Sequence, residues 1–151
     1  MLAIQDIWPS STAQLSNDER RERLQNKTRL IDLQLLSVAR EAAEFAASDA
    51  WEEDGFASPI DWMRFNCHLT STVAANLIAV GERVGELPES TDAMVAGRIG
   101  FAHMTAMTRT ADAVGASFNE TAMLEKAEEN SPGKFYYICR HYRHAADRKG
   151  F

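Results

Sequence analysis

The stretch from Trp62 to Met104 constrains the fold most, because signals that begin and end helices recur along it at short intervals. Leu87-Pro88 and Gly97 are two of these breaks. The segments between the breaks predict a short helix, a tight turn and a second helix, followed by two further helices. This order is typical of helix-turn-helix modules, in which a short turn sets one helix across another.

A long helix is predicted before this stretch. Ser16 and Glu19 have the spacing of a capping box, in which each side chain accepts a hydrogen bond from the backbone N–H of the other residue. No Gly or Pro follows until Gly55. We therefore expect the helix to run from Ser16 to about Asp49, a length of roughly 50 Å.

Apolar residues recur along this predicted helix every seven residues, at Leu24, Ile31, Val38 and Phe45, with Leu35 and Ala42 between them. Such a stripe is buried either against the helix's own domain or against the helix of a second copy. Both interpretations stay open. The second predicts a homo-oligomer, in the simplest case a dimer, whose interface contains Leu24, Ile31 and Leu35.

Capping residues mark the remaining helices. Helix starts are predicted at Ser58, Thr70, Pro88, Asn119 and Ser131, a further helix over residues 101–115, and an acidic loop over Trp51–Gly55. No segment has the two-residue alternation of a strand. We expect an all-α fold, a bundle of seven helices with a long N-terminal helix and a central helix-turn-helix-like unit. The expected organisation is an N-terminal arm over residues 1–15 and a single helical domain over residues 16–151.

The predicted helix from Thr70 to Val84 has two faces. The face expected to pack inward carries Val73, Leu77, Val80 and Val84. The outward face carries Ser71, Thr72, Ala75 and Ala79, with Asn76 at its edge. In the following helix, His103 lies among apolar residues and is expected to be packed or hydrogen-bonded.

Charge is unevenly distributed along the chain. The net charge of −6 disfavours a polyanion as partner, because Lys and Arg supply the affinity for phosphates. From Ser131 onward, however, there are five basic residues and one acidic residue. Four of these bases, interleaved with aromatic residues, are Lys134, Arg140, Arg143 and Arg148. This pattern is used by surfaces that contact phosphates and stack bases, and equally by solvated helix ends that complement the helix dipole.

Other features bound the class of protein. No run of eighteen apolar residues is present, and the first residues lack the basic start and apolar middle of a secretory signal, so we expect a soluble, cytoplasmic protein with no membrane partner. Cys67 and Cys139 have no C-x-x-C partner and are expected to be reduced thiols.

Neither a metal nor a cofactor is predicted. Cys139, His141 and His144 lie close together on one predicted helix, but a fourth ligand is missing and arginines lie between them. The chain carries no Gly-rich phosphate loop and no nucleophile motif. No small-molecule substrate is evident, and an enzyme is not expected.

Several separated motifs resemble a known family. In chain order they are Gly55-Phe-Ala-Ser-Pro-Ile-Asp-Trp62-Met-Arg64, Cys67-His-Leu69-Thr70, Leu87-Pro88, Gly97-Arg98-Ile99 and His103. With them, residues 16–150 resemble the bacterial domain of unknown function 222 family. That family is an α-helical domain found ahead of HNH endonuclease domains in actinobacterial and phage proteins. Residues 145–150 are similar to the middle of its domain, as expected for either a truncated chain or a short paralogue.

This resemblance implies a DNA-associated accessory domain without catalysis. An HNH site needs a ββα hairpin that positions histidines and a metal. No such hairpin can be drawn around any of the four histidines, His68, His103, His141 and His144.

The central region is also similar in layout to the helix-turn-helix of chromosome-partition proteins, which would make Thr70–Val84 the recognition helix. The residues expected to contact DNA are then Arg64, Thr70, Ser71, Thr72 and Asn76, together with Lys134, Arg140, Arg143 and Arg148. The first turns of this helix lack the Arg, Lys or Gln that usually read base edges. A scaffold in which Ser71, Ala75 and Ala79 pack against another helix therefore stays open. For the whole chain, the alternative to a DNA-associated module is a self-associating protein-interaction module that binds no nucleic acid.

Overall fold

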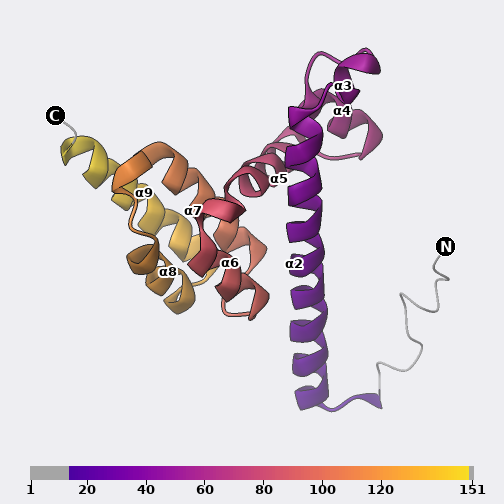
Figure 1. The fold of residues 1–151 in the computed structure, drawn as a ribbon. Helices are drawn as coiled ribbons and strands as arrows, with labels where there is room; N and C mark the ends of the chain where they lie inside the picture. Colours follow the sequence, from indigo (N-terminus) through magenta and orange to yellow (C-terminus); the bar gives the residue numbers. More distant parts are fainter. Residues whose placement is uncertain (1–13, 150–151) are drawn as a thin grey trace. The chain divides into compact units, whose positions relative to one another are not determined.

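The computed structural model describes residues 14–149, and Figure 1 shows their arrangement into helices. Within these residues there are eight α-helices, two short 3-10 segments and no strand. The expected all-α class is confirmed. The predicted arm over residues 1–15 lies almost entirely outside the described residues. In chain order the elements are α2 (Asn17–Ala47), α3 (Ala50–Glu53), α4 (Pro59–Asn66), α5 (Ser71–Arg83), η2 (Val84–Glu86), α6 (Pro88–Val95), α7 (Phe101–Val114), η3 (Gly115–Ser117), α8 (Glu120–Glu129) and α9 (Pro132–Lys149).

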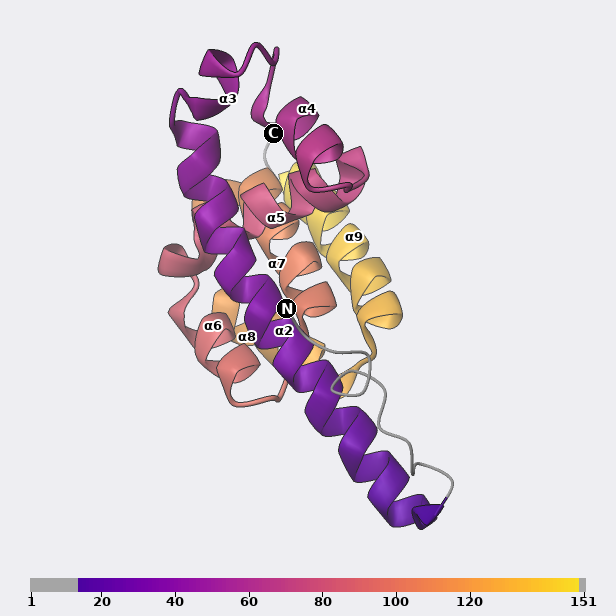
Figure 2. The same cartoon turned by 90° about the vertical axis from the view of Figure 1, so that its right-hand side faces the viewer.

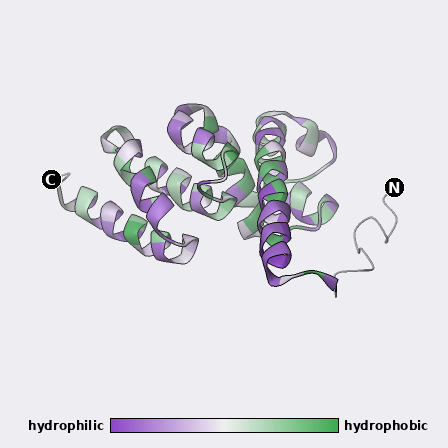
Figure 3. Ribbon diagram, turned by 90° about the horizontal axis from the view of Figure 1, so that it is seen from below, coloured by the Kyte–Doolittle hydropathy of each residue, from purple (hydrophilic) through white to green (hydrophobic). Residues whose placement is uncertain are grey.

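The chain divides into two compact units, one ending at Ile31 and the other beginning at Asp32. The described part of the first unit is dominated by the start of α2, where the predicted capping box is confirmed. The Glu19 N–H donates to Ser16 Oγ at 3.1 Å, and the Ser16 N–H donates to Glu19 Oε1 at 3.4 Å. Figure 3 shows that the first turns of this helix are mainly hydrophilic. Leu24, Leu30 and Ile31 are nevertheless apolar, and all three are exposed.

Helix starts in the second unit follow the predicted caps. Four side chains accept a hydrogen bond from the backbone N–H three residues on: Ser58 at 3.0 Å, Thr70 at 3.2 Å, Asn119 at 3.1 Å and Ser131 at 3.5 Å. Gly97 follows α6 with a φ of 82°, a conformation that favours glycine. These local signals therefore set where four of the described helices begin and where α6 ends.

The predicted acidic loop at Trp51–Gly55 is wrong in part, because Ala50–Glu53 form the short helix α3. Glu52 and Glu53 lie in its first turn, where negative charge is favoured by the helix dipole. The indole N–H of Trp51 donates to the carbonyl of Ala46 at 3.3 Å, and this bond ties the turn back to the end of α2. One hydrogen bond and two favourably placed acidic residues thus stabilise an eighth helix, and because none of them contributes to an apolar period, the sequence pattern did not predict it.

The core of the second unit lies around α7. Its side chains Met104 and Met107 are fully buried, and α9 contributes Phe135 to the same cluster. Helices α7 and α9 run side by side in both views (Figures 1 and 2), and α5 packs on α7 from another side. Helix α7 is therefore the central element of this unit, and α5, α6, α8 and α9 all pack against it.

One residue of the predicted inward face of α5 is placed differently. Leu77, Val80 and Val84 are buried as expected, but Val73 is 42% exposed and Ala74 is buried instead. Ser71 and Thr72 are exposed as well, so all three of the first residues of α5 are open to solvent. Periodicity gives the direction in which a side chain points but not whether a neighbouring helix extends that far.

His103 joins the start of α7 to the α8–α9 connection. Its Nδ1 accepts from the Gly100 N–H at 3.0 Å, which makes Nε2 the protonated nitrogen, and Nε2 donates to the Asn130 carbonyl at 2.8 Å. The imidazole is 8% exposed and lies beside the Phe135 ring. The expectation of a packed, hydrogen-bonded histidine is confirmed.

Candidate functional site

The predicted helix-turn-helix is built from α4 and α5, which pack against each other. The connection between them includes His68, whose φ of 57° is uncommon for a residue other than glycine. Leu69, which follows, packs against the core. Thr70 then ends the turn as the cap of α5, so its hydroxyl oxygen is occupied by the Val73 N–H.

A groove lies between α5, α7 and α9. Its wider part has a volume of about 400 Å³ and a narrower continuation has about 70 Å³; the two parts share Ala106, Arg109 and Tyr136. We call the two parts together the α7 groove. It is lined by Thr72 and Asn76 of α5, Ala102, Thr105, Ala106, Arg109 and Thr110 of α7, and Pro132, Gly133, Tyr136, Cys139 and Arg143 of α9.

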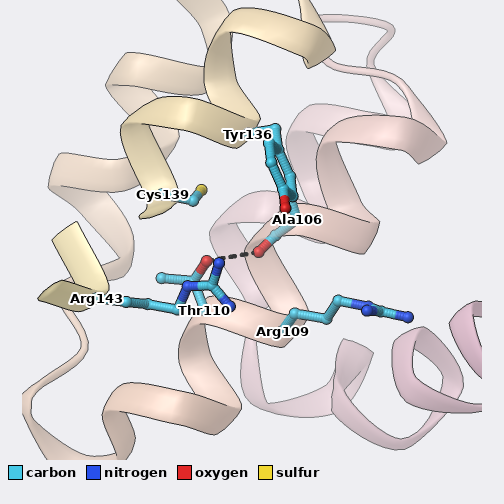
Figure 4. Close-up of a pocket in the computed structure, with 6 residues that line it drawn as sticks. All are labelled: Ala106, Arg109, Thr110, Tyr136, Cys139 and Arg143. Carbon is cyan, nitrogen blue, oxygen red and sulfur yellow. Dashed lines mark hydrogen bonds between the residues drawn. The ribbon is translucent and has the colours of Figure 1, made fainter. Parts of the chain in front are cut away.

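Two arginines give this groove positive charge. In Figure 4, Arg143 of α9 reaches toward Thr110, whereas Arg109 of α7 extends away from that residue. Arg109 donates to the amide oxygen of Asn76 at 2.5 Å, and this neutral partner positions its guanidinium without cancelling its charge. No ion pair to either arginine occurs among the described residues, and no acidic residue lines the groove.

Tyr136 forms the aromatic wall of the groove. Its ring lies along Ala106 of α7 (Figure 4), and half of the residue is exposed. The neighbouring Tyr137 is 61% exposed and contacts Tyr136 edge to face, with ring centroids 5.5 Å apart. Of these two tyrosines, Tyr136 lines the groove and Tyr137 does not.

Cys139 lines the narrow part and is almost fully buried. Burial raises the pKa of its thiol, and this effect outweighs the opposite influences of a hydrogen bond with Thr110 and of the nearby Arg143 charge. The thiol is therefore protonated and a poor nucleophile at neutral pH. His141 and His144 are both exposed, so the three potential metal ligands of α9 do not converge. No cluster of metal-ligating side chains occurs in the described residues.

The structure brings some of the residues predicted to contact DNA together and separates others. Thr72, Asn76 and Arg143 line the α7 groove. Ser71, Lys134 and Arg140 are exposed but do not line it. Arg64 lies on α4, is half exposed and pairs with Asp61 at 3.5 Å, beside a separate hollow that includes Phe65. The side chain of Arg148 is outside the described residues.

Arg109 is the groove residue that the sequence did not reveal. It stands between two threonines on a helix whose other face is core, and nothing near it in the sequence marks it as special. Its partner Asn76 is 33 residues away. It could have been found by searching each helix that is expected to be largely buried for an arginine on its polar face.

The residues of the predicted dimer interface differ in burial. Leu24 is 67% exposed and Ile31 is 58% exposed. Leu35 belongs to the second unit and packs against that unit's core. Leu24 and Ile31 are thus exposed apolar residues, whereas Leu35 is not free to form an interface.

No family model, curated protein or solved structure matches this chain. In the described part of the chain, none of the helices has the length and apolar character needed to cross a membrane.

Proposed function

We propose that this protein is a non-catalytic, DNA-associated module that binds the phosphate backbone through the α7 groove. The observation that carries the proposal is that Arg109 and Arg143 both line one groove and that no carboxylate lines it. Lys134 and Arg140 add exposed positive charge on α9. The whole chain has a net charge of −6 and therefore repels a polyanion. The cluster of basic residues at the groove nevertheless attracts a polyanion locally.

The resemblance to a domain that precedes HNH endonucleases supports DNA as the polyanion. Helix α5 has a supporting part in this proposal. Its Asn76 is engaged by Arg109, and Ala75 and Ala79 are half-buried, so the residues open to solvent are those of its first turn. Hydroxyls such as those of Ser71 and Thr72 contact phosphates readily, and phosphate contacts position a protein without specifying sequence. We therefore expect binding with little preference among base sequences.

The first prediction tests the two groove arginines. Arg109→Gln with Arg143→Gln removes two positive charges while keeping much of each side chain's length. The dependence of log affinity on log salt concentration should become shallower by about 1.8 for a duplex and about 1.4 for a single strand, because fewer counterions are released. Fluorescence anisotropy with a labelled duplex of about twenty base pairs, and with one of its strands, measures both slopes.

The matched control is Arg21→Gln with Arg98→Gln, which changes the net charge equally. These arginines lie outside the groove and pair with Asp18 and Glu128. Their replacement should leave the slopes within about 0.5 of the wild-type values. Equal changes in the two double variants would show that net charge, not the groove, determines binding. A wild-type protein that binds neither duplex nor single strand at low salt would overturn the proposal.

A second function is favoured by the exposed apolar residues of α2: self-association through Leu24 and Ile31. These residues are seven positions apart and therefore lie on the same side of the helix. A second copy of the helix could cover them. This module would bind a protein, and its affinity would not depend steeply on salt.

The second prediction separates this function from the first. Leu24→Glu with Ile31→Glu should convert a dimer into a monomer, because association would bury unpaired carboxylates. Light scattering after size-exclusion chromatography measures the mass. The control is Leu30→Glu, which changes a residue of similar exposure on a different side of the helix and should leave the dimer intact. A wild-type protein that is monomeric at high micromolar concentration would rule out self-association.

A further inference from the structure

We infer that the α7 groove takes an unpaired nucleotide, with its base stacked on Tyr136 and its phosphates near Arg109 and Arg143, so that the protein prefers single-stranded to duplex DNA. This inference rests on the proposed function and specifies its substrate. The geometry that points to it is the position of Tyr136, which lines both the wide and the narrow part of the groove.

Stacking requires an aromatic face that solvent, and therefore a base, can reach. Tyr136 is half exposed although it lies next to the core residues Phe135 and Cys139, which are buried. Aromatic side chains that flank a basic groove stack successive bases and are tolerant of base identity.

The size of the groove also favours an unpaired strand. A volume of about 400 Å³ is within the range of pockets that hold one small organic group. In a duplex, each base is paired and stacked inside the helix and cannot reach a side chain in such a pocket unless it is flipped out. A single strand presents its bases without that cost.

The groove carries positive charge along its length. Pro132 and Gly133, at the start of α9, line the wide part, where the N-terminal end of an 18-residue helix contributes partial positive charge. Arg109 lies in both parts and Arg143 in the narrow part. Along α9, Tyr136 lies between the start of the helix and Arg143. A strand that follows the groove therefore places a base against the Tyr136 ring while its phosphates stay near the arginines.

The competing arrangement is recognition of duplex bases by α5, but few side chains of this helix are free to contact base edges. The amide of Asn76, the side chain best suited to read an adenine, accepts a hydrogen bond from Arg109. A major groove approached by the first turn of α5 would meet the hydroxyls of Ser71 and Thr72 and the exposed Val73. These side chains supply no bidentate contact to a base.

The experiment compares wild type, Tyr136→Ala and Tyr137→Ala in binding a labelled thymidine oligonucleotide and a duplex of equal length at low salt. Tyr137→Ala is the matched control, because it removes the same side chain at a more exposed position outside the groove. We expect wild type to bind the single strand more tightly than the duplex. Tyr136→Ala should weaken single-strand binding by about 5- to 150-fold, the range for loss of one stacked base. It should change duplex binding by less than about twofold.

Tyr136→Phe gives a second readout, because it keeps the ring and removes the hydroxyl. The Tyr136→Phe variant should retain single-strand affinity within about threefold. In a separate measurement, quenching of tyrosine fluorescence by the oligonucleotide should be lost in Tyr136→Ala and kept in Tyr137→Ala. Duplex binding at least as tight as single-strand binding, or equal effects of the two alanine variants, would overturn the inference while leaving the DNA-binding function in place. Absence of binding to both DNAs would instead remove the function on which it rests.

Discussion

Gly81→Ala is expected to destabilise the protein by at least about 3 kcal/mol. A Cβ atom at this position would lie 1.9 Å from the backbone oxygen of Ala39 and 2.8 Å from the Cβ of Ala43. Both residues belong to the part of α2 in the second unit, and backbone cannot move aside as a flexible side chain does. Helix α5 would have to shift away from α2, which would open the packing of Leu77 and Val80.

The sign of this effect is informative, because helix propensity predicts the opposite. Replacing glycine by alanine inside an exposed helix normally stabilises it by about 1 kcal/mol. The control is Gly85→Ala in η2, where an added Cβ meets nothing within 4 Å and should leave stability unchanged or slightly higher. Urea unfolding followed by circular dichroism measures both variants. Similar unfolding midpoints for Gly81→Ala and wild type would contradict the close approach of α5 to α2.

The fold was predictable where local chemistry decides it. Ser16, Ser58, Thr70 and Asn119 each place a side-chain oxygen against a backbone N–H three residues on, and a single residue type at a single position carries that information. The close contact at Gly81 was not predictable, because a glycine within a helical pattern is equally compatible with a solvated position. Its meaning depends on Ala39, which is far away in sequence.

The candidate site was predictable in part for the same reason. The basic and aromatic residues of α9 are concentrated in one segment, so composition alone marks them. The packing of α7 determines which of these residues line the groove. Tyr136 and Arg143 line it, whereas Tyr137 and Arg140 do not. Arg109 enters the site from a third helix. A sequence pattern on one helix cannot show which side of it a neighbour leaves uncovered.

His103→Ala is the second substitution expected to have a large effect. The imidazole satisfies the Gly100 N–H at the start of α7 and the Asn130 carbonyl before α9. Removing it leaves both backbone groups without their partner in a nearly buried position, and each such group costs about 1–3 kcal/mol. The lost contact with the Phe135 ring adds a cavity. We expect a total loss of about 3 kcal/mol or more and a fall in the melting temperature of roughly 10 °C.

Two further variants separate these contributions. His103→Asn places an amide oxygen near the position of Nδ1, so it should keep the bond from the Gly100 N–H and lose the one to Asn130, with an intermediate effect. His141→Ala removes an exposed histidine of α9 and should change stability by less than about 0.5 kcal/mol. If His103→Ala melted together with His141→Ala, the imidazole would not be joining α7 to the α8–α9 connection. Because α9 carries Tyr136 and Arg143, a weakened connection should also lower DNA affinity near the melting temperature, whereas His141→Ala should not.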